Sequence, residues 1–532
     1  MEEKISNFKE KLVRVVYKMQ LYVSESLLIA SLLLAALIFV FFIYMRTQKL
    51  PDLAAILPAE DTFAFATFSI EDYLASADAL PDDSPFAASK LQIPFEYYLG
   101  SNPEKLDFID DKIGIAFVSE EPVIFFKIKS EKKALKYLKT LLIPDEELSE
   151  ENNIYSYPVS HPFSFAFTEN LLAFSTKPEI LKEILDDNEK IIDTENYQNL
   201  RSRLQYFSSA FFYSNLPKTR LYIAQAFAKI GVNELGFMES LFQIFSSFGG
   251  TIKMSDSGWN LETFTAVDKS RIENEAFFRY DTKYEQKFLP YLPENFLFEW
   301  GGHNIKAQVF RMIDLLNALH SSAALIFESS IKATALQYLG EGIDLEKEIY
   351  PILDGEYLFA MSPESVVLIL EITLEESSEI YKLRDLFART YQYKNERQVE
   401  VEIDGNKVTE TQATLVPLTQ IDKNYEGHTY VEWKAGDKSF ASIAILDDKA
   451  VFATNEKDLF DILDKMDGRA EKRSIRDYGQ LLSGSDEISI LHIELLPDGN
   501  ILKDLLKGFK NFATTRKVFD DGIFTRHSLQ FK

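Results

Sequence analysis

The chain has 532 residues, with 57 lysines and arginines against 83 aspartates and glutamates, so its formal net charge is −26. We expect no nucleic-acid partner, because neutralising phosphates takes clustered lysines and arginines. The absence of cysteine excludes disulfides, thiol nucleophiles, iron–sulfur clusters and cysteine-ligated zinc. A hydrophobic content of 46% is ample for packed cores and argues against disorder.

The first predicted element is an apolar run over residues 27–45, LLIASLLLAALIFVFFIYM. As a helix it would rise about 28 Å, close to the thickness of a membrane's hydrocarbon core. A cleaved signal peptide fits less well, because its apolar stretch is typically about 7 to 15 residues. A buried core helix is rarely apolar on every face for so long. We therefore expect a transmembrane helix over residues 27–45, retained as a signal anchor.

Basic residues set the expected orientation of this helix. Residues 1–26 carry Lys4, Lys9, Lys11, Arg14 and Lys18 ahead of the run. The positive-inside rule then places residues 1–26 in the cytoplasm. The remaining, strongly acidic part of the chain would lie outside, so the sequence predicts a single-pass protein of the plasma membrane with an extracytoplasmic bulk.

From residue 51 onward, short strands alternate with helices. We expect strands over residues 62–68, 113–118, 123–128, 164–168, 171–175 and 207–214, and helices over 132–142 and 178–187. Hairpin turns of two to four residues require antiparallel pairing, and the many Phe and Tyr positions suit a half-buried pleated surface. Residues 221–248 are apolar but interrupted by charges such as Lys229 and Glu234. They predict a long helix packed on a soluble core, not a second span.

The chain also resembles itself in order along its length. Five segments recur: Leu57-Pro58 with Leu292-Pro293, 98–100 with 338–340, 109–128 with 353–372, 172–186 with 450–464, and Leu216-Pro217 with Leu496-Pro497. One such match can arise by convergence, because strand-turn-helix segments share a hydrophobic pattern. Five matches in the same order make chance a poor explanation.

These patterns predict an α+β fold with an N-terminal transmembrane helix followed by two tandem copies of an antiparallel-sheet-plus-helices unit. The expected copies cover residues 51–270 and 285–532, and the second contains an insertion near 388–430. In that insertion, Asp404-Gly405 lies between alternating residues, which is a strong hairpin signal. We expect the insertion to be a surface elaboration.

The search for catalytic motifs finds little. The six histidines, His161, His303, His320, His428, His492 and His527, lack metal-ligand spacing, and no HExxH, Walker, G-x-G-x-x-G or G-x-S-x-G motif occurs. Gly301-Gly302-His303 can expose an imidazole at a strand end, but an ordinary surface histidine beside a turn is the favoured interpretation. We predict no catalytic, cofactor-binding or metal-ligating residue, and no cofactor.

Acidic pairs recur at expected turns: Asp82-Asp83, Asp110-Asp111, Asp186-Asp187, Asp447-Asp448 and Asp520-Asp521. Several hard oxygens can bind a divalent cation, but aspartate is also a common turn residue because its side chain caps its own backbone. We favour turns, since no D-x-D-x-D-G loop gathers these oxygens. Glycosidase-type carboxylate pairs stay open, because their members can be distant in sequence.

Three segments together resemble a known family: Leu57 to Thr62, reading LPAEDT, the hairpin from Asp110 to Val118, and the strand and helix from Phe174 to Leu185. Behind a single anchor, they are similar to a group of bacterial membrane-anchored envelope proteins catalogued as a domain of unknown function. The resemblance covers most of residues 51–532, and the second copy departs from it at Asn295 and Phe296. It implies a bacterial envelope protein and supplies no catalytic residues.

The favoured function is a noncatalytic, membrane-anchored binding or scaffolding module of the bacterial cell envelope. Its expected partners are the membrane and an envelope protein, lipid or glycan. One alternative is an envelope hydrolase acting on cell-wall or surface polymers, which a cleft with clustered carboxylates of shifted pKa would favour. The other is a lipid or peptide binder, which an apolar groove would favour.

Overall fold

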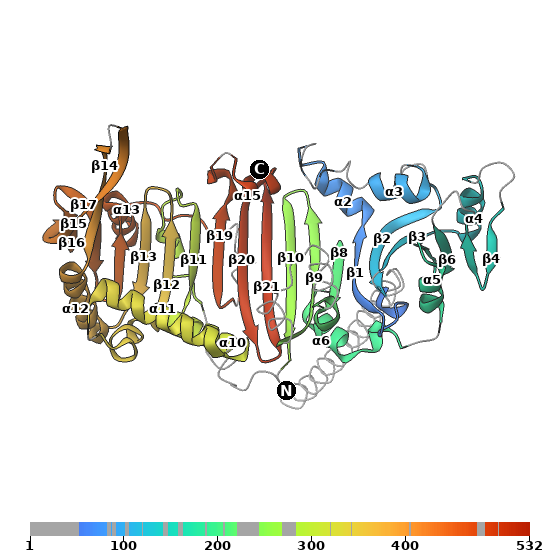
Figure 1. The fold of residues 1–532 in the computed structure, drawn as a ribbon, viewed down its shortest axis with the longest axis horizontal. Coiled ribbons are helices and arrows are strands. Elements are labelled where there is room, and N and C mark those ends of the chain that lie inside the picture. Colours follow the sequence, from blue (N-terminus) through green and yellow to red (C-terminus); the bar gives the residue numbers. More distant parts are fainter. Residues whose placement is uncertain are drawn as a thin grey trace, which may run out of the picture.

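A single antiparallel sheet runs along the long axis of the computed structural model, and helices pack on both of its faces (Figure 1). The structure describes residues 53–532 except 82–83, 85–86, 88–91, 102–105, 120, 142–146, 158–162, 187–188, 206–207, 221–243, 269–283, 320, 342, 404–405, 476–484 and 498. The helix expected over 221–248 therefore lies largely outside the described residues, as do His161 and His320.

The first half of the sheet has the strand order β4-β5-β6-β7-β3-β2-β1-β8-β9-β10, from the outer edge to the centre. The strand bounds are β1 (Thr62–Ser69), β2 (Ile109–Val118), β3 (Glu121–Ile128), β4 (Ser149–Glu151), β5 (Ile154–Ser156), β6 (Ser164–Thr168), β7 (Leu171–Ser175), β8 (Ala210–Asn215), β9 (Phe245–Ser255) and β10 (Gly258–Val267).

The second half has the order β21-β20-β19-β11-β12-β13-β18-β17-β16-β15, from the centre to the other edge. Its strands are β11 (Phe298–His303), β12 (Glu356–Met361), β13 (Val366–Glu371), β14 (Gln392–Ile403), β15 (Asn406–Tyr425), β16 (His428–Ala435), β17 (Lys438–Ile445), β18 (Lys449–Ala453), β19 (Glu487–His492), β20 (Phe509–Phe519) and β21 (Gly522–Phe531).

The two halves join where β10 pairs with β21 at the centre of the sheet (Figure 1). The register runs from Gly258 opposite Gln530 to Ala266 opposite Gly522. Gly258 has a φ of +141°, and a Cβ there would lie 2.1 Å from the Leu529 carbonyl oxygen. A residue without a Cβ is therefore required where the two hairpins meet.

Side chains reinforce this junction. The indole of Trp259, on β10, is 8% exposed, and its Nε1 donates to Ser76 Oγ at 3.1 Å. The ring packs edge-on against Phe509 of β20, with a centroid distance of 5.4 Å. Glu262 of β10 accepts a hydrogen bond from Arg526 Nε of β21 at 3.0 Å. Residues from both halves thus form one small core and one ion pair at the centre.

The described helices cover both faces of the sheet. Their bounds are α2 (Ile70–Ala77), α3 (Gln92–Leu99), α4 (Glu131–Lys139), α5 (Pro178–Leu185), α6 (Glu195–Arg203), α10 (Ile305–Leu319), α11 (Ser321–Leu339), α12 (Leu374–Thr390), α13 (Glu456–Met466) and α15 (Ile501–Leu505). Local signals start several of them. Thr373 and Glu376, for example, form a capping box at the start of α12, satisfying two backbone N–H groups.

Strand β3 shows why both faces need cover. Val123 and Phe125 belong to one buried cluster, while Ile124 and Phe126 belong to another on the opposite face. All four side chains are buried. A strand with both faces buried is a continuous apolar run instead of an alternating one, and the sequence PVIFF has this composition.

The fold-class prediction is wrong. It placed two tandem units behind a transmembrane helix, whereas the described residues form one large sheet that continues through the β10–β21 pairing. The reason is physical: an edge strand has unpaired backbone groups, and here the edge of one half is satisfied by the edge of the other. The periodicity of a segment indicates that it is a strand but not which distant strand it pairs with.

The predicted localisation, a single-pass plasma-membrane protein, is also corrected. Among the residues that the structure describes, no helix combines the length and the apolar character needed to cross a membrane. Residues 27–45, on which that prediction rested, lie outside the described residues.

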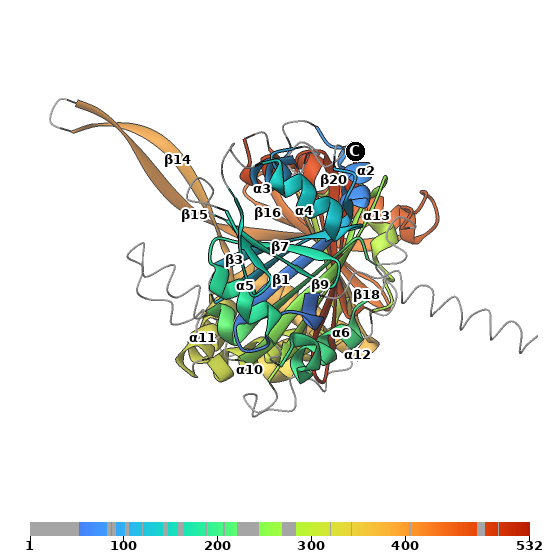
Figure 2. The same ribbon diagram turned by 90° about the vertical axis from the view of Figure 1, so that its right-hand side faces the viewer.

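Strands β14 and β15 form a long hairpin that projects from the body (Figure 2). The register runs from Gln392 opposite Pro417 to Ile403 opposite Asn406. Only the later part of β15, residues 418–425, pairs with β16 and joins the main sheet. This is the hairpin that Asp404-Gly405 indicated, although these two turn residues lie outside the described part.

Replacing Trp259 by alanine tests the central junction. We expect the Trp259→Ala substitution to lower the free energy of unfolding by about 3–5 kcal/mol, as for other buried aromatic residues, measured by chemical denaturation. Leu502 is 48% exposed, so Leu502→Ala should change that free energy by no more than about 0.5 kcal/mol. A Trp259→Ala protein as stable as the wild type would contradict the packing described here.

Candidate functional site

The best candidate site is an apolar cavity of about 480 Å³ beneath α11. Its walls come from α10, α11 and two short helical turns, η7 (Leu345–Ile349) and η8 (Pro351–Leu353). From α11, the lining residues Phe327, Ile331, Tyr338 and others recur at helical spacing, so one face of the helix is turned toward the cavity. Ile349 closes it from η7.

Two hydroxyl side chains of the lining, Ser330 and Thr334, already donate hydrogen bonds within the protein. Ser330 Oγ donates to the Ile326 carbonyl oxygen and Thr334 Oγ1 donates to the Ser330 carbonyl oxygen, both at 2.8 Å. These are bonds from a side chain to the preceding helical turn. Consequently the hydroxyl hydrogens are not directed at a ligand, and the wall is carbon almost throughout.

One lining residue, Tyr338, belongs to a stack of aromatic rings. The ring of Tyr338 stacks on Tyr391 with centroids 5.5 Å apart, and Tyr391 stacks on Phe387 at 5.1 Å. Elsewhere in the wall, Tyr350 packs edge-on against Phe310 at 5.4 Å. Rings with few rotatable bonds give a wall that keeps its shape without a ligand.

Charged side chains flank the cavity, and none of the described lining residues is charged. On α11, Lys332 Nζ lies 2.7 Å from Glu328 Oε1, and Lys382 of α12 pairs with Glu348 of η7. Burial, together with the nearby Glu328 carboxylate, raises the pKa of the Tyr350 phenol. The ligand-facing wall is therefore neutral, with paired charges beside it.

A second cluster surrounds Glu356, which lies opposite His303 in the β11–β12 register. The Glu356 carboxylate is 1% exposed and accepts hydrogen bonds from the backbone N–H groups of Glu285, at 3.1 Å, and Lys287. Burial raises its pKa to about 7. Beside it, Lys287 Nζ lies 2.5 Å from Glu371 Oε1. Both carboxylate oxygens of Glu356 accept hydrogen bonds from backbone N–H groups. The cluster therefore anchors the segment around residues 285–287 and presents no acid to a substrate.

A third cluster is a buried ion pair at the end of the β11–β19 region. Glu299 is 1% exposed, and its Oε1 lies 2.5 Å from Arg473 Nη1 and 3.1 Å from His492 Nε2. The other imidazole nitrogen of His492 lies 3.0 Å from Asn511 Oδ1. Buried charges are stable only when paired and hydrogen-bonded, and this network supplies that pairing. Its burial leaves no access for a substrate.

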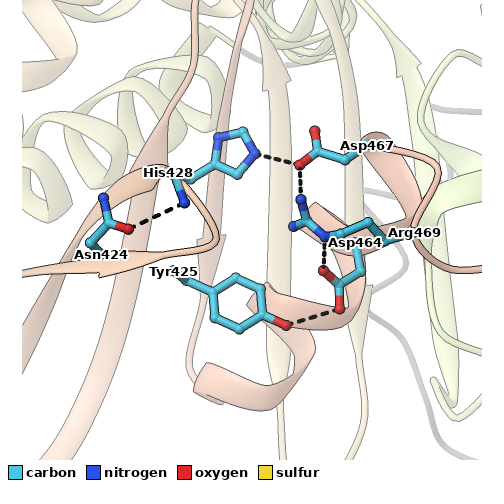
Figure 3. A network of polar contacts seen from close by, with 7 residues as sticks. Asn424, Tyr425, His428, Asp464, Asp467 and Arg469 are labelled. Carbon is cyan, nitrogen blue, oxygen red and sulfur yellow. Dashed lines mark hydrogen bonds and ion pairs between the residues drawn. The ribbon is translucent and has the colours of Figure 1, made fainter.

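A fourth cluster ties the β15–β16 turn to the end of α13 (Figure 3). His428 Nε2 and Arg469 Nη1 lie 2.7 Å and 2.5 Å from Asp467 Oδ2. Arg469 Nε contacts Asp464 Oδ1 at 2.7 Å, and Tyr425 donates to Asp464 Oδ2 at 2.9 Å. The bond with His428 lowers the pKa of Asp467. Since these groups satisfy one another, the cluster holds the turn in place.

The acidic pairs of the sequence lie in separate parts of the structure. Asp111 accepts hydrogen bonds from Ser69 Oγ and the Glu71 backbone N–H, both at 2.7 Å, and Asp521 pairs with Arg203 at 2.7 Å. Within the described ranges, no three metal-ligating side chains come together. Asp82-Asp83 and Asp187 lie outside those ranges.

Sequence reasoning missed the cavity. It named an apolar groove without fixing its location, whereas the cavity is built from α10, α11 and the turns that follow them. One signal was available: residues 321–339, SSAALIFESSIKATALQYL, have only two charged side chains in nineteen positions. A surface helix normally carries a charged outer face, so this composition points to a helix with apolar contacts on more than one side.

The raised pKa of Glu356 gives a pH prediction. The unfolded state releases this proton near the ordinary value of 4.5 and the folded state near 7, so the contribution of Glu356 to stability is lost as pH rises through this range. The expected loss is about 3 kcal/mol. In Glu356→Gln this fall should be absent from unfolding free energies measured between pH 4.5 and 7. Exposed Glu364 supplies the control, Glu364→Gln; parallel pH profiles for Glu356→Gln and wild type would refute the assignment.

Comparison with solved structures gives only distant likenesses. Crystal forms III and IV of TP0453 align with TM-scores of 0.24 at 7% and 8% identity, covering 41% and 45% of this chain and 80% and 90% of that one. Crystal form I gives a TM-score of 0.23 at 7% identity. At these TM-scores the alignments carry no inference about fold or function. Comparison with curated proteins gives no match.

The expected resemblance to a domain of unknown function is confirmed. A family model described as "Protein of unknown function (DUF3352)" matches residues 118–474, more than half of the chain. The match covers most of the strands of both halves and the whole of α10, α11 and the cavity beneath them. The chain belongs to the DUF3352 family.

Proposed function

We propose that the protein is a noncatalytic binding module whose ligand is an apolar chain, such as the acyl chain of a lipid, held in the cavity beneath α11. The observation that carries the proposal is the cavity itself, because its volume of about 480 Å³ lies within the roughly 300–1,000 Å³ of small-molecule sites. This favours the lipid binder among the functions considered from the sequence.

The chemistry of the wall selects a hydrocarbon. A peptide or a glycan would bring amide or hydroxyl groups into the cavity, and burying each without a hydrogen-bond partner costs about 1–3 kcal/mol. The hydroxyl hydrogens of Ser330 and Thr334 are engaged within α11. An acyl chain needs no such partners, and burial contributes about 0.8 kcal/mol per CH₂ group.

The same wall argues against a hydrolase at this site. The residues that the structure describes in the lining are aliphatic and aromatic, with Ser330 and Thr334, and none of them is a carboxylate, imidazole or amine. General acid–base catalysis most often uses such a group within hydrogen-bond reach of the substrate. The carboxylate with the raised pKa, Glu356, is buried and bonded to backbone, so it does not supply that group.

A filled cavity tests the proposal. A fluorescent long-chain fatty acid should bind the wild-type protein, and Ala335→Trp, which places an indole in the cavity, should weaken binding at least ten-fold, about 1.4 kcal/mol. The matched control is Ala333→Trp, on the exposed outward face of the same helix, which should bind like the wild type.

Two results would refute the proposal: a wild-type protein that does not bind the fatty acid, or an Ala335→Trp protein that binds it as well as the wild type. Thermal unfolding should be followed in parallel. If Ala335→Trp does not fold, Ile349→Trp fills the same cavity from η7 and provides the same comparison.

A further inference from the structure

The outward face of α11 is apolar although it is open to solvent. Leu325, Ile326 and Leu336 are 62%, 67% and 51% exposed, and Ser329 and Ala333 between them are exposed as well. Their spacing is that of one helix face. Since the opposite face lines the cavity, α11 presents apolar residues on both sides, whereas a surface helix normally turns polar residues outward.

We propose that this face, residues 325, 326, 329, 333 and 336, is a self-association surface at which the α11 helices of two copies of the chain pack antiparallel. In Figure 2, α10 and α11 lie at the margin of the body, where a second molecule can approach. The proposal is independent of the proposed ligand, because the cavity and the outward face use different residues of α11.

The face complements itself under a two-fold axis that passes between residues 330 and 331. With that axis, Leu325 of the first copy lies opposite Leu336 of the second. By symmetry, Leu336 of the first copy lies opposite Leu325 of the second, at the other end of the contact. The small side chains of Ser329 and Ala333 lie beside the axis, where the helices are closest. Small residues at this point suit the interaxial distance of about 8–10 Å found for packed helices.

Charge favours a second copy in the antiparallel sense. Glu328 and Lys332 lie on one flank of the outward face and are 40% and 64% exposed. In an antiparallel pair this flank meets the same flank of the other copy, so each Glu328 comes opposite a Lys332. In a parallel pair it would meet the opposite flank, which carries Ser330 and Gln337 and no charge. Flanking charges of this kind set partner and orientation in helix pairs.

The area available predicts modest affinity. Stable interfaces bury at least about 1,200 Å² of surface. Two single helices that pack together bury less, so this interface is of the weak, transient class. Association should therefore depend on concentration, with a dissociation constant in roughly the micromolar range. Desolvation of Leu325 and Leu336 supplies most of the expected driving force.

Cysteine cross-linking tests the register without background, because the chain has no cysteine of its own. An equimolar mixture of Leu325→Cys and Leu336→Cys proteins under mild oxidation should give a covalent dimer of the two. Either protein alone should give little, because in the antiparallel pair two copies of position 325 are about 16 Å apart along the axis, beyond the reach of a disulfide. A mixture containing Leu502→Cys instead of Leu336→Cys is the control. Cross-linking of Leu325→Cys alone, or equal yields in all mixtures, would overturn the proposal.

Sedimentation velocity over a concentration series tests the charge pairing. Lys332→Glu should weaken association at least ten-fold, and the swapped pair Glu328→Lys with Lys332→Glu should restore it. A wild-type protein that stays monomeric at about 100 micromolar, well above the expected dissociation constant, would overturn the proposal. So would a monomer that binds neutral phosphatidylcholine vesicles through Leu325, because the face would then be a lipid-docking surface.

Two tryptophan variants separate this proposal from the proposed function. Ala333→Trp, on the outward face, should abolish dimerisation and leave fatty-acid binding intact. Ala335→Trp, in the cavity, should abolish fatty-acid binding and leave dimerisation intact. If Ala333→Trp dimerises like the wild type, the self-association surface is wrong, whatever the outcome of the ligand experiment.

Discussion

The antiparallel pairing of β10 with β21 is the contact on which the rest of the structure depends. Each strand is ten residues long and ends its half of the sheet. Left unpaired, each would be a long edge with a row of free backbone groups, which is a template for aggregation. Their pairing removes both edges at once. Outward from it, the strand order is β10-β9-β8-β1 on one side and β21-β20-β19-β11 on the other, so the sheet continues without a break through its centre.

The cavity arises from a difference between the two sides of that centre. Between β1 and β2 the chain forms α2 and α3, each eight residues long. The corresponding connection between β11 and β12 forms α10 and α11, of 15 and 19 residues. Helix α11 packs mainly on α10 and α12, so the space beneath it lies between helices and the turns η7 and η8 and opens to solvent on one side. The longer connection therefore adds a binding site without disturbing the sheet.

Much of the local structure could be predicted from the sequence. The strands expected over 164–168 and 171–175 are β6 and β7 with the same bounds, because Glu169 and Asn170 adopt the positive φ values of a tight hairpin turn. The β10–β21 pairing could not be predicted, because it joins residues more than 250 positions apart and hydrophobic periodicity describes a strand without naming its partner. The hydrogen-bond partners of Glu299 and Glu356 could not be predicted for the same reason, since burial and hydrogen bonding depend on which distant segments meet.

Amide hydrogen exchange at the centre of the sheet tests the account most directly. If β10 and β21 form one ladder, the backbone N–H groups that point across it, on alternate residues of each strand, should exchange as slowly as those of the inner strands β1 and β12, because exchange there requires opening of the whole sheet. Fast exchange confined to β10 and β21, with slow exchange in β1 and β12, would show two separate sheets and contradict the central claim.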